Sequence, residues 1–385
     1  AASDVYKRQI GDPAVKMAYP EFGMKVTTVN GQSVDGNSIS FKALEKITVE
    51  GEVLDASGQL VTDFTCIVNP TVKDSKVTVT CLKNSNKDDS PAFTFTDYPN
   101  TIFIGNDSVR NGKFSFTFTV PKDISYSNLQ GKMNLYAVDT ESGNEAQGNF
   151  DNFIVGGTSD TAETDTIGPE IRALYLNDTT FVDGGQVNTT PYFVAELWDK
   201  SGVNITGSSV GHDMMLVIDE STVLSYNLNS YYELLLGEDG TGIVKFPIPA
   251  LEPGKHTAEF WVWDILNNST VRTFTFEVVE GLKPFLFDVI ATPGIAREQV
   301  TFHLMHNRPE SRMRVGIMVY DLAGRQLWKH EESGTSGLFE NYTVSWDLTS
   351  GGARMRPGVY IYRAAISTDN SKDATKARKF IILGE

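Results

Sequence analysis

The sequence predicts an all-β protein of three immunoglobulin-like β-sandwiches in series, and two recurring patterns carry this prediction. Apolar and polar residues alternate through Phe114, Phe116 and Phe118, and again through Phe274 and Phe276. Alternation rich in aromatic and β-branched residues is typical of a strand that is buried on one face. Helical periodicity with capping residues is almost lacking, which argues against a helical or an alternating α/β fold.

The second pattern is a strand that ends in aspartate and runs into a turn. An Asp side chain accepts hydrogen bonds from its own turn, and a following Gly or Asn supplies the positive φ that closes it. Five such turns along the chain favour several similar modules over one large fold. They begin at Asp55, Asp139, Asp199, Asp264 and Asp321.

Domain boundaries are expected where small, polar and proline residues cluster. Residues 156–169 have the composition of a linker, and residues 280–284 form a shorter hinge. We therefore expect a first sandwich at residues 21–157, a second at 166–280 and a third at 281–385. Each has on the order of 100 to 140 residues, the size of an immunoglobulin-like sandwich with insertions.

Two segments are expected to lie outside the three sandwiches, and a third segment is expected to form a loop of the first sandwich. Residues 1–9 resemble translated adapter read-through, so we expect them to be foreign to the protein. Residues 10–20 are expected to be the tail of an upstream domain. The polar residues 84–90 are expected to form an exposed loop.

The charge of the chain is uneven. The net charge is -16, but residues 281–385 hold 14 Lys+Arg against 11 Asp+Glu, about +3, which leaves -19 on the rest. An acidic chain argues against nucleic acid as a partner, because neutralising phosphates needs a basic face. Apolar runs stay far below the roughly 20 residues of a membrane-spanning helix. The change of sign predicts that the third sandwich presents a different surface from the other two.

The residues suggest no catalytic, cofactor or metal site. His303 and His306 are three apart in an expected strand, so their side chains point to opposite faces and cannot share a metal. His256 follows a Pro-Gly turn, where a structural hydrogen bond is expected. Each aspartate turn offers one carboxylate where a calcium loop needs several, so calcium is disfavoured.

Cys66 and Cys81 are the two cysteines. A hairpin turning at Lys73 and Asp74 would place them opposite each other on one apolar face. They would then form either a disulfide, if the compartment is oxidising, or two buried thiols that pack as small apolar groups. Neither has a neighbouring His in the sequence or a helix N-terminus to lower its pKa, so neither is expected to be a nucleophile.

Trp261 and Trp263 lie on one face of an expected strand. They form either a platform on which a sugar stacks or part of the core. The opposite face, with Phe260 and Val262, is apolar as well, which favours a central strand buried on both faces.

Short motifs follow one another in a defined order along the chain. They are Gly11-Asp12-Pro13-Ala14, Val120-Pro121-Lys122-Asp123-Ile124-Ser125-Tyr126, Phe153-Ile154-Val155-Gly156-Gly157, Gly211-His212-Asp213, Pro253-Gly254-Lys255-His256, Val319-Tyr320-Asp321-Leu322-Ala323-Gly324-Arg325 and Pro357-Gly358-Val359-Tyr360. Their order resembles that of the type IX secretion system sortases, the PorU-like, gingipain-type C25 cysteine peptidases of Bacteroidota. The resemblance covers nearly the whole chain after residue 9.

The resemblance implies a non-catalytic part of an exported enzyme at the outer membrane of a Gram-negative bacterium. Members of this family cleave the C-terminal signals of secreted cargo and attach the cargo to lipopolysaccharide. Their catalytic His and Cys lie upstream of the matched stretch, and no residue here corresponds to them. The first two sandwiches would support the peptidase. The third would be a C-terminal secretion domain that holds the protein to an outer-membrane β-barrel (PorV-like) and to other components of the attachment complex.

Two other functions use the same modules. One is the C-terminal half of a secreted, degradative gingipain-like peptidase, from which the C-terminal domain would be cleaved. The other is a surface adhesin or glycan-binding protein, which exposed Trp261 and Trp263 would favour.

Overall fold

The computed structural model describes residues 19–83, 91–139, 142–160, 165–207, 211–235, 240–368 and 371–384. Residues 1–9, most of the expected upstream tail and the expected loop at 84–90 lie outside these ranges. The described residues form β-strands and one short 3-10 helix, η1 (Asn229–Tyr231), so the predicted all-β fold is confirmed. None of their helical segments has the length and apolar character needed to cross a membrane.

Contacts along the chain divide it into two compact units. The first comprises Ala1–Thr164 with Thr206–Val210, and the second comprises Asp165–Ile205 with Gly211–Glu385. The second and third predicted sandwiches therefore fall within one unit.

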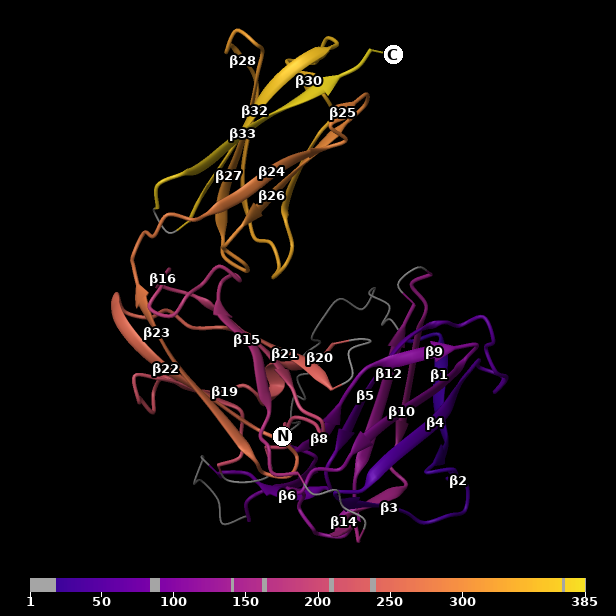
Figure 1. The fold of residues 1–385 in the computed structure, drawn as a ribbon. Coiled ribbons are helices and arrows are strands. Elements are labelled where there is room, and N and C mark those ends of the chain that lie inside the picture. The colour runs from indigo at the N-terminus through magenta and orange to yellow at the C-terminus, as the bar shows by residue number, and fades with distance from the viewer. Residues whose placement is uncertain are drawn as a thin grey trace, which may run out of the picture. The chain divides into compact units, whose positions relative to one another are not determined.

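One nine-stranded sheet dominates the first unit (Figure 1). Its order is β12-β13-β1-β4-β10-β9-β5-β8, with β2 paired to β1. Because β12 pairs with both β13 and β5, seven of these strands form a closed ring. The strands are β1 (Phe22–Val29), β2 (Gln32–Ser33), β4 (Lys46–Leu54), β5 (Cys66–Lys73), β8 (Thr101–Ile104), β9 (Asp107–Arg110), β10 (Lys113–Thr119), β12 (Lys132–Val138) and β13 (Glu145–Phe150).

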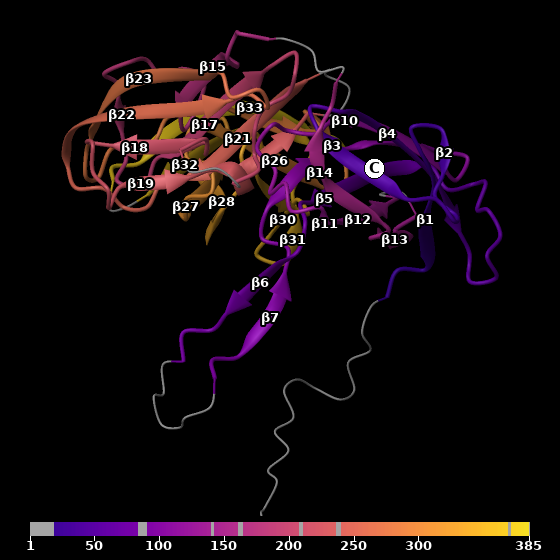
Figure 2. The same cartoon turned by 90° about the horizontal axis from the view of Figure 1, so that it is seen from below.

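Two small sheets complete the first unit. One has the order β11-β14-β3, and the other is the β6–β7 ribbon, which Figure 2 shows as a separate arm. Their strands are β3 (Ile39–Ala43), β6 (Val77–Thr80), β7 (Thr94–Asp97), β11 (Leu129–Gln130) and β14 (Phe153–Thr158).

Strand β10 illustrates why these segments form strands. Phe114, Phe116 and Phe118 are buried, while Ser115 and Thr117 between them are exposed. The three rings stack along the inner face of the sheet. The alternation in the sequence therefore corresponds to one buried and one exposed face, as predicted.

The second unit begins with two facing sheets. Their orders are β15-β17-β21-β20 and β16-β23-β22-β18-β19. The strands are β15 (Glu170–Leu176), β16 (Gln186–Val187), β17 (Tyr192–Trp198), β18 (Met215–Ile218), β19 (Ser225–Asn227), β20 (Tyr232–Leu234), β21 (Thr241–Pro247), β22 (Gly254–Trp263) and β23 (Ser269–Val278).

A further pair of sheets forms the C-terminal part of this unit. Their orders are β24-β26-β29 and β25-β33-β32-β27-β28, with a β30–β31 ribbon, and one hydrophobic core lies between them. The strands are β24 (Leu286–Thr292), β25 (Ile295–Ala296), β26 (Val300–His306), β27 (Met313–Tyr320), β28 (Gln326–Gly334), β29 (Tyr342–Trp346), β30 (Thr349–Ser350), β31 (Ala353–Arg354), β32 (Gly358–Ser367) and β33 (Ala374–Ile382).

The predicted aspartate turns are present. Asp321 Oδ1, for example, accepts hydrogen bonds from the backbone N–H of Ala323 at 3.0 Å and of Arg325 at 2.9 Å. Gly324 follows with a φ of +83°, a conformation that costs glycine little. Carboxylates at the ends of strands therefore organise the turns of both units.

Candidate functional site

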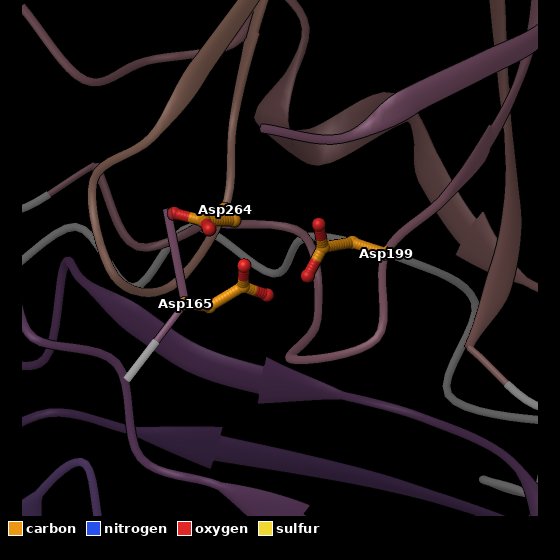
Figure 3. Close-up of side chains that lie close together, drawn as sticks. All are labelled: Asp165, Asp199 and Asp264. Atoms are coloured by element: carbon orange, nitrogen blue, oxygen red, sulfur yellow. The ribbon is translucent and has the colours of Figure 1, made fainter. Parts of the chain in front are cut away.

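Three aspartates lie close together at one end of the first sheet pair of the second unit. They are Asp165, Asp199 and Asp264, and each offers a carboxylate oxygen within 4.8 Å of the others. Figure 3 shows their carboxylates facing one another from three separate loop segments. Asp199 and Asp264 are 4% and 0% exposed, so two of the three charges lie inside the protein.

A short backbone crossover brings the turns of Asp199 and Asp264 together. The chain that leaves β17 does not form a hairpin with a following strand. Instead, Val203 forms an isolated antiparallel bridge with Asp264. The N–H of Ile265 donates to Gly202 O at 3.0 Å, and the N–H of Asn204 donates to Trp263 O at 2.8 Å. This bridge joins the end of β17 in one sheet to the end of β22 in the other.

Each buried aspartate also organises its own turn. Asp199 Oδ1 accepts from the N–H of Ser201 at 2.7 Å and of Gly202 at 2.9 Å. Asp264 Oδ1 accepts from Leu266 N and Asn268 N, and its Oδ2 accepts from Asn268 Nδ2 at 2.7 Å.

Asp165 connects the preceding linker to both turns. Its Oδ2 accepts from Ser201 Oγ at 3.0 Å, and its backbone carbonyl accepts from Asn268 Nδ2 at 3.1 Å. Its Oδ1 accepts from Ile167 N at 3.0 Å. The predicted linker at residues 156–169 therefore contains a residue that hydrogen bonds attach to both turns.

Burial controls the ionisation of the cluster. It raises the pKa of Asp199 to about 6, with smaller contributions from the carboxylates of Asp264 and Asp165, and against the lowering effect of the Ser201 and Gly202 N–H groups. Burial likewise raises the pKa of Asp264, opposed by its bonds to Asn268. The N–H of Ile167 lowers the pKa of the more exposed Asp165. The three groups therefore do not ionise alike.

Three converging carboxylates can bind a hard cation or share a proton. Carboxylate oxygens are the ligands that Ca²⁺ prefers, and Ca²⁺ takes six to eight oxygen ligands. The three side chains alone would supply part of such a set. Protonation of Asp199, whose pKa is raised, is the other way to relieve the repulsion between the three carboxylates.

The sequence pattern predicted that Asp199 and Asp264 each end a strand and begin a turn. It did not predict that the two turns lie next to each other. The prediction that no metal binds rested on one carboxylate per turn, whereas the fold groups two turns with a linker residue. Two aspartate turns of the same kind in one predicted sandwich, preceded by a linker that contains aspartates, are the signal that could have suggested this grouping.

The predicted Cys66–Cys81 hairpin is wrong. Strand β5 pairs with β12, β8 and β9, so Cys66 lies opposite Val109, while β6 pairs with β7. Both thiols are free. The expected turn at Lys73 and Asp74 does not form because Asp74 is buried and its Oδ2 accepts from Ser125 N at 2.8 Å.

His256 and His306 form hydrogen bonds within the fold. His256 bridges Asp219 Oδ2 at 2.7 Å and Glu252 O at 2.8 Å, as the turn context predicted. His306 accepts from Arg308 N through Nδ1, so its Nε2 carries the proton toward Ser336 Oγ at 2.8 Å. Burial lowers the pKa of His306 to about 4, with a smaller effect from Arg308.

Trp261 and Trp263 form neither an exposed platform for a sugar nor part of a fully buried core. Trp261 and Trp263 are half-buried, whereas Phe260 and Val262 on the other face are buried completely. The ring of His212 lies 4.4 Å from that of Trp263, centroid to centroid. The strand is thus buried on one face only, and its outer face is not an open aromatic platform.

Among solved structures, the chain is similar to dimeric latent PorU from Porphyromonas gingivalis. The identity is 38%, the match covers 98% of this chain and 35% of the PorU chain, and the TM-score is 0.44. Identity at this level over nearly the whole chain supports a PorU-like relationship. The chain spans about a third of the length of PorU.

Two other solved structures are far more distant. The FN1–FN3 domains of chicken CNTN1 are 8% identical, with 94% of this chain and 98% of that one covered and a TM-score of 0.20. A tetra-tandem repeat of a large adhesion protein is 14% identical, with 95% and 74% covered and a TM-score of 0.20. Neither carries an argument about function. No family model and no curated protein matches the chain.

Proposed function

We propose that this chain is the non-catalytic scaffold and outer-membrane anchoring region of a type IX secretion sortase. The whole enzyme would be a cysteine endopeptidase that removes the C-terminal signals of secreted proteins and attaches them to lipopolysaccharide. In this proposal the catalytic His and Cys belong to an upstream domain. The observation that carries the proposal is the 38% identity to PorU over 98% of the chain.

The chemistry of the cysteines supports a non-catalytic role. A cysteine nucleophile needs a lowered pKa, because the thiolate is the reactive form. Burial, and then the carboxylate of Asp139, raises the pKa of Cys66 to about 11. Cys66 also lies in the closed sheet of the first unit, opposite Val109, and not at a helix N-terminus.

The charge distribution supports an anchoring role for the C-terminal sheet pair. Residues 281–385 carry about +3, while the rest of the chain carries -19. We propose that this region meets an outer-membrane β-barrel partner (PorV-like) at the cell surface. The first unit and the first sheet pair of the second unit would then hold the peptidase domain and its secreted cargo.

Deletion of the C-terminal sheet pair in the complete enzyme tests this proposal. We expect a strain whose sortase lacks residues 286–384 to release the enzyme from the outer membrane and to accumulate cargo with uncleaved C-terminal signals. An enzyme with its upstream catalytic Cys changed to Ala should keep its location but not its activity. Normal cargo processing by the truncated enzyme would contradict the proposal.

The fate of the C-terminal region distinguishes the sortase from a degradative peptidase. We expect the mature surface protein to keep residues 281–385, because an anchored enzyme needs its anchor. The intact mass of the purified protein measures this directly. Loss of this region on export would favour a secreted degradative peptidase.

A further inference from the structure

We propose that the outer face of the five-stranded sheet β25-β33-β32-β27-β28 docks onto an acidic protein surface. This inference rests on the proposed function, because it names the part of the chain that meets the anchoring partner. We call this surface the basic sheet face. It is defined by Ile295, Val359, Ile361, Arg314, Arg363 and Lys379.

The pleat of the sheet separates this face from the core. In β32, Tyr360, Tyr362 and Ala364 point inward and are buried, whereas Ile361 and Arg363 between them are exposed. In β27, Val315 and Val319 are buried, and Arg314 points outward. The side chains of the outer face therefore do not pack in the hydrophobic core.

Apolar side chains gather at one end of the face. Ile295 is 56% exposed, Val359 39% and Ile361 37%. They are neighbours across the sheet, since Ile295 and Val359 both pair with Ile381. Ile361 pairs with Tyr320, which is half-buried. Isolated exposed apolar residues are common, but a contiguous group marks an interaction surface.

Cations lie directly beside this apolar group. Lys379 is opposite Ile361, and Arg363 is opposite Met318 on the next strand. Arg314, Arg363 and Lys379 are exposed and form no ion pair with any described residue. The acidic Glu331 on this sheet is already paired with Lys329 at 2.8 Å. The free charges of the face are therefore positive.

The composition of the face favours a different protein over a second copy or a membrane. A two-fold dimer through this face would place two positively charged surfaces against each other, which costs free energy. Surfaces that insert into bilayers present Trp, Phe and Leu. The apolar side chains that define this face are instead β-branched, and Gly316 and Ala365 add little bulk beside them. An apolar patch edged by unpaired cations is complementary to a protein surface with carboxylates around an apolar centre.

Charge reversal on the face tests the inference in the full chain. The probe is the purified PorV-like barrel encoded in the same genome, in detergent, with binding measured by interferometry at 50 and 300 mM NaCl. We expect R363E/K379E to weaken binding at least tenfold and to lower its salt dependence. I361S should weaken it several-fold. The matched control K372E changes an exposed cation in the β32–β33 connection and should leave affinity within twofold.

The outcomes separate this inference from the proposed function. If wild type binds and the double variant, shown by circular dichroism to be folded, binds equally well, the basic sheet face is not the docking surface, while anchoring stands. If wild type does not bind the barrel, both proposals fail. Binding of wild type to phosphatidylglycerol vesicles that the double variant loses would assign the face to a membrane. Self-association in sedimentation that the double variant loses would assign it to a second copy. Either result would overturn the inference.

Discussion

Two side chains of the second unit, the buried Asp199 and the half-buried His306, have surroundings that favour their uncharged forms. Burial raises the pKa of the Asp199 carboxyl to about 6 and lowers the pKa of the His306 imidazole to about 4. Each shift couples folding to pH, because the folded and unfolded chains then bind different numbers of protons. The two residues have opposite effects on stability between pH 4 and pH 6.5.

We expect the free energy that Asp199 contributes to folding to become less favourable as pH rises. Its folded pKa of about 6 lies above the ordinary value of 3.8, so the folded state binds more protons between pH 3.8 and pH 6, and stability falls as pH rises through this interval. Asp199→Asn keeps an Oδ1 acceptor for Ser201 and Gly202 but cannot ionise. The variant should be more stable than wild type by about 3 kcal/mol at pH 7, and by much less at pH 4.

Thermal unfolding of both proteins in EDTA, which keeps divalent cations away from the cluster, measures this difference. A difference in stability that is the same at pH 4 and pH 7 would contradict the account of Asp199.

His306 should act in the opposite direction. Its folded pKa of about 4 lies below the ordinary 6.5, so the unfolded chain binds more protons between these values. The stabilisation is present above pH 6.5 and is lost as pH falls, by about 2 kcal/mol between pH 7 and pH 5. Protonation would also break the bond that His306 Nδ1 accepts from Arg308 N.

Wild type compared with His306→Gln by chemical denaturation at the two pH values tests this prediction. We expect wild type to lose more stability than the variant on acidification. Equal losses would show that the ring titrates alike in the folded and unfolded chains.

Among the elements, the strands and their turns were the most predictable from the sequence. The Phe residues of β10 and the aspartate turns depend on neighbours within a few residues, so local patterns suffice to identify them. Grouping Asp165 with Asp199 and Asp264 depends on the Val203–Asp264 bridge between two sheets. No local pattern encodes that bridge, which is why the cluster was missed.

The misassigned hairpin has a physical cause of the same kind. Lys73 and Asp74 have the composition of a turn, but the Asp74 carboxylate is buried and bonded to a backbone group about fifty residues away. Strand β5 then pairs with β12, β8 and β9, which come later in the chain. Tertiary hydrogen bonds thus override a local turn preference.

We expect the two thiols to react at different rates in the folded protein. Cys81 is exposed, while Cys66 is half-buried with a pKa raised to about 11. Protein purified without reductant should therefore react with one equivalent of a thiol reagent at pH 8, at Cys81, and with a second only after denaturation. Cys81→Ser should abolish the rapid phase, and Cys66→Ser should leave it. A protein with no reactive thiol until reduction would instead contain a disulfide.

At the scale of the whole molecule, two features stand out: the uneven distribution of charge along the chain and the similarity of the chain to one part of PorU. The acidic first part and the basic C-terminal region differ in the sign of their charge, and the proposed anchoring role rests in part on this difference. The chain corresponds to about a third of the length of PorU. The sequence could suggest the relationship to PorU because the order of short motifs can be recognised along a chain. The partner and the substrate could not be predicted, because they depend on surfaces formed by folding and on residues outside the matched part of PorU.

The reading frame upstream of the codon for Ile10 tests the central claim most directly. The account predicts that sequencing the source DNA will show the frame continuing into an α/β domain that contains a His followed by a Cys. This chain would then be the scaffold and anchor of that peptidase. A start codon and signal peptide immediately before Gly11 would contradict the account and favour a surface-binding protein without a catalytic domain.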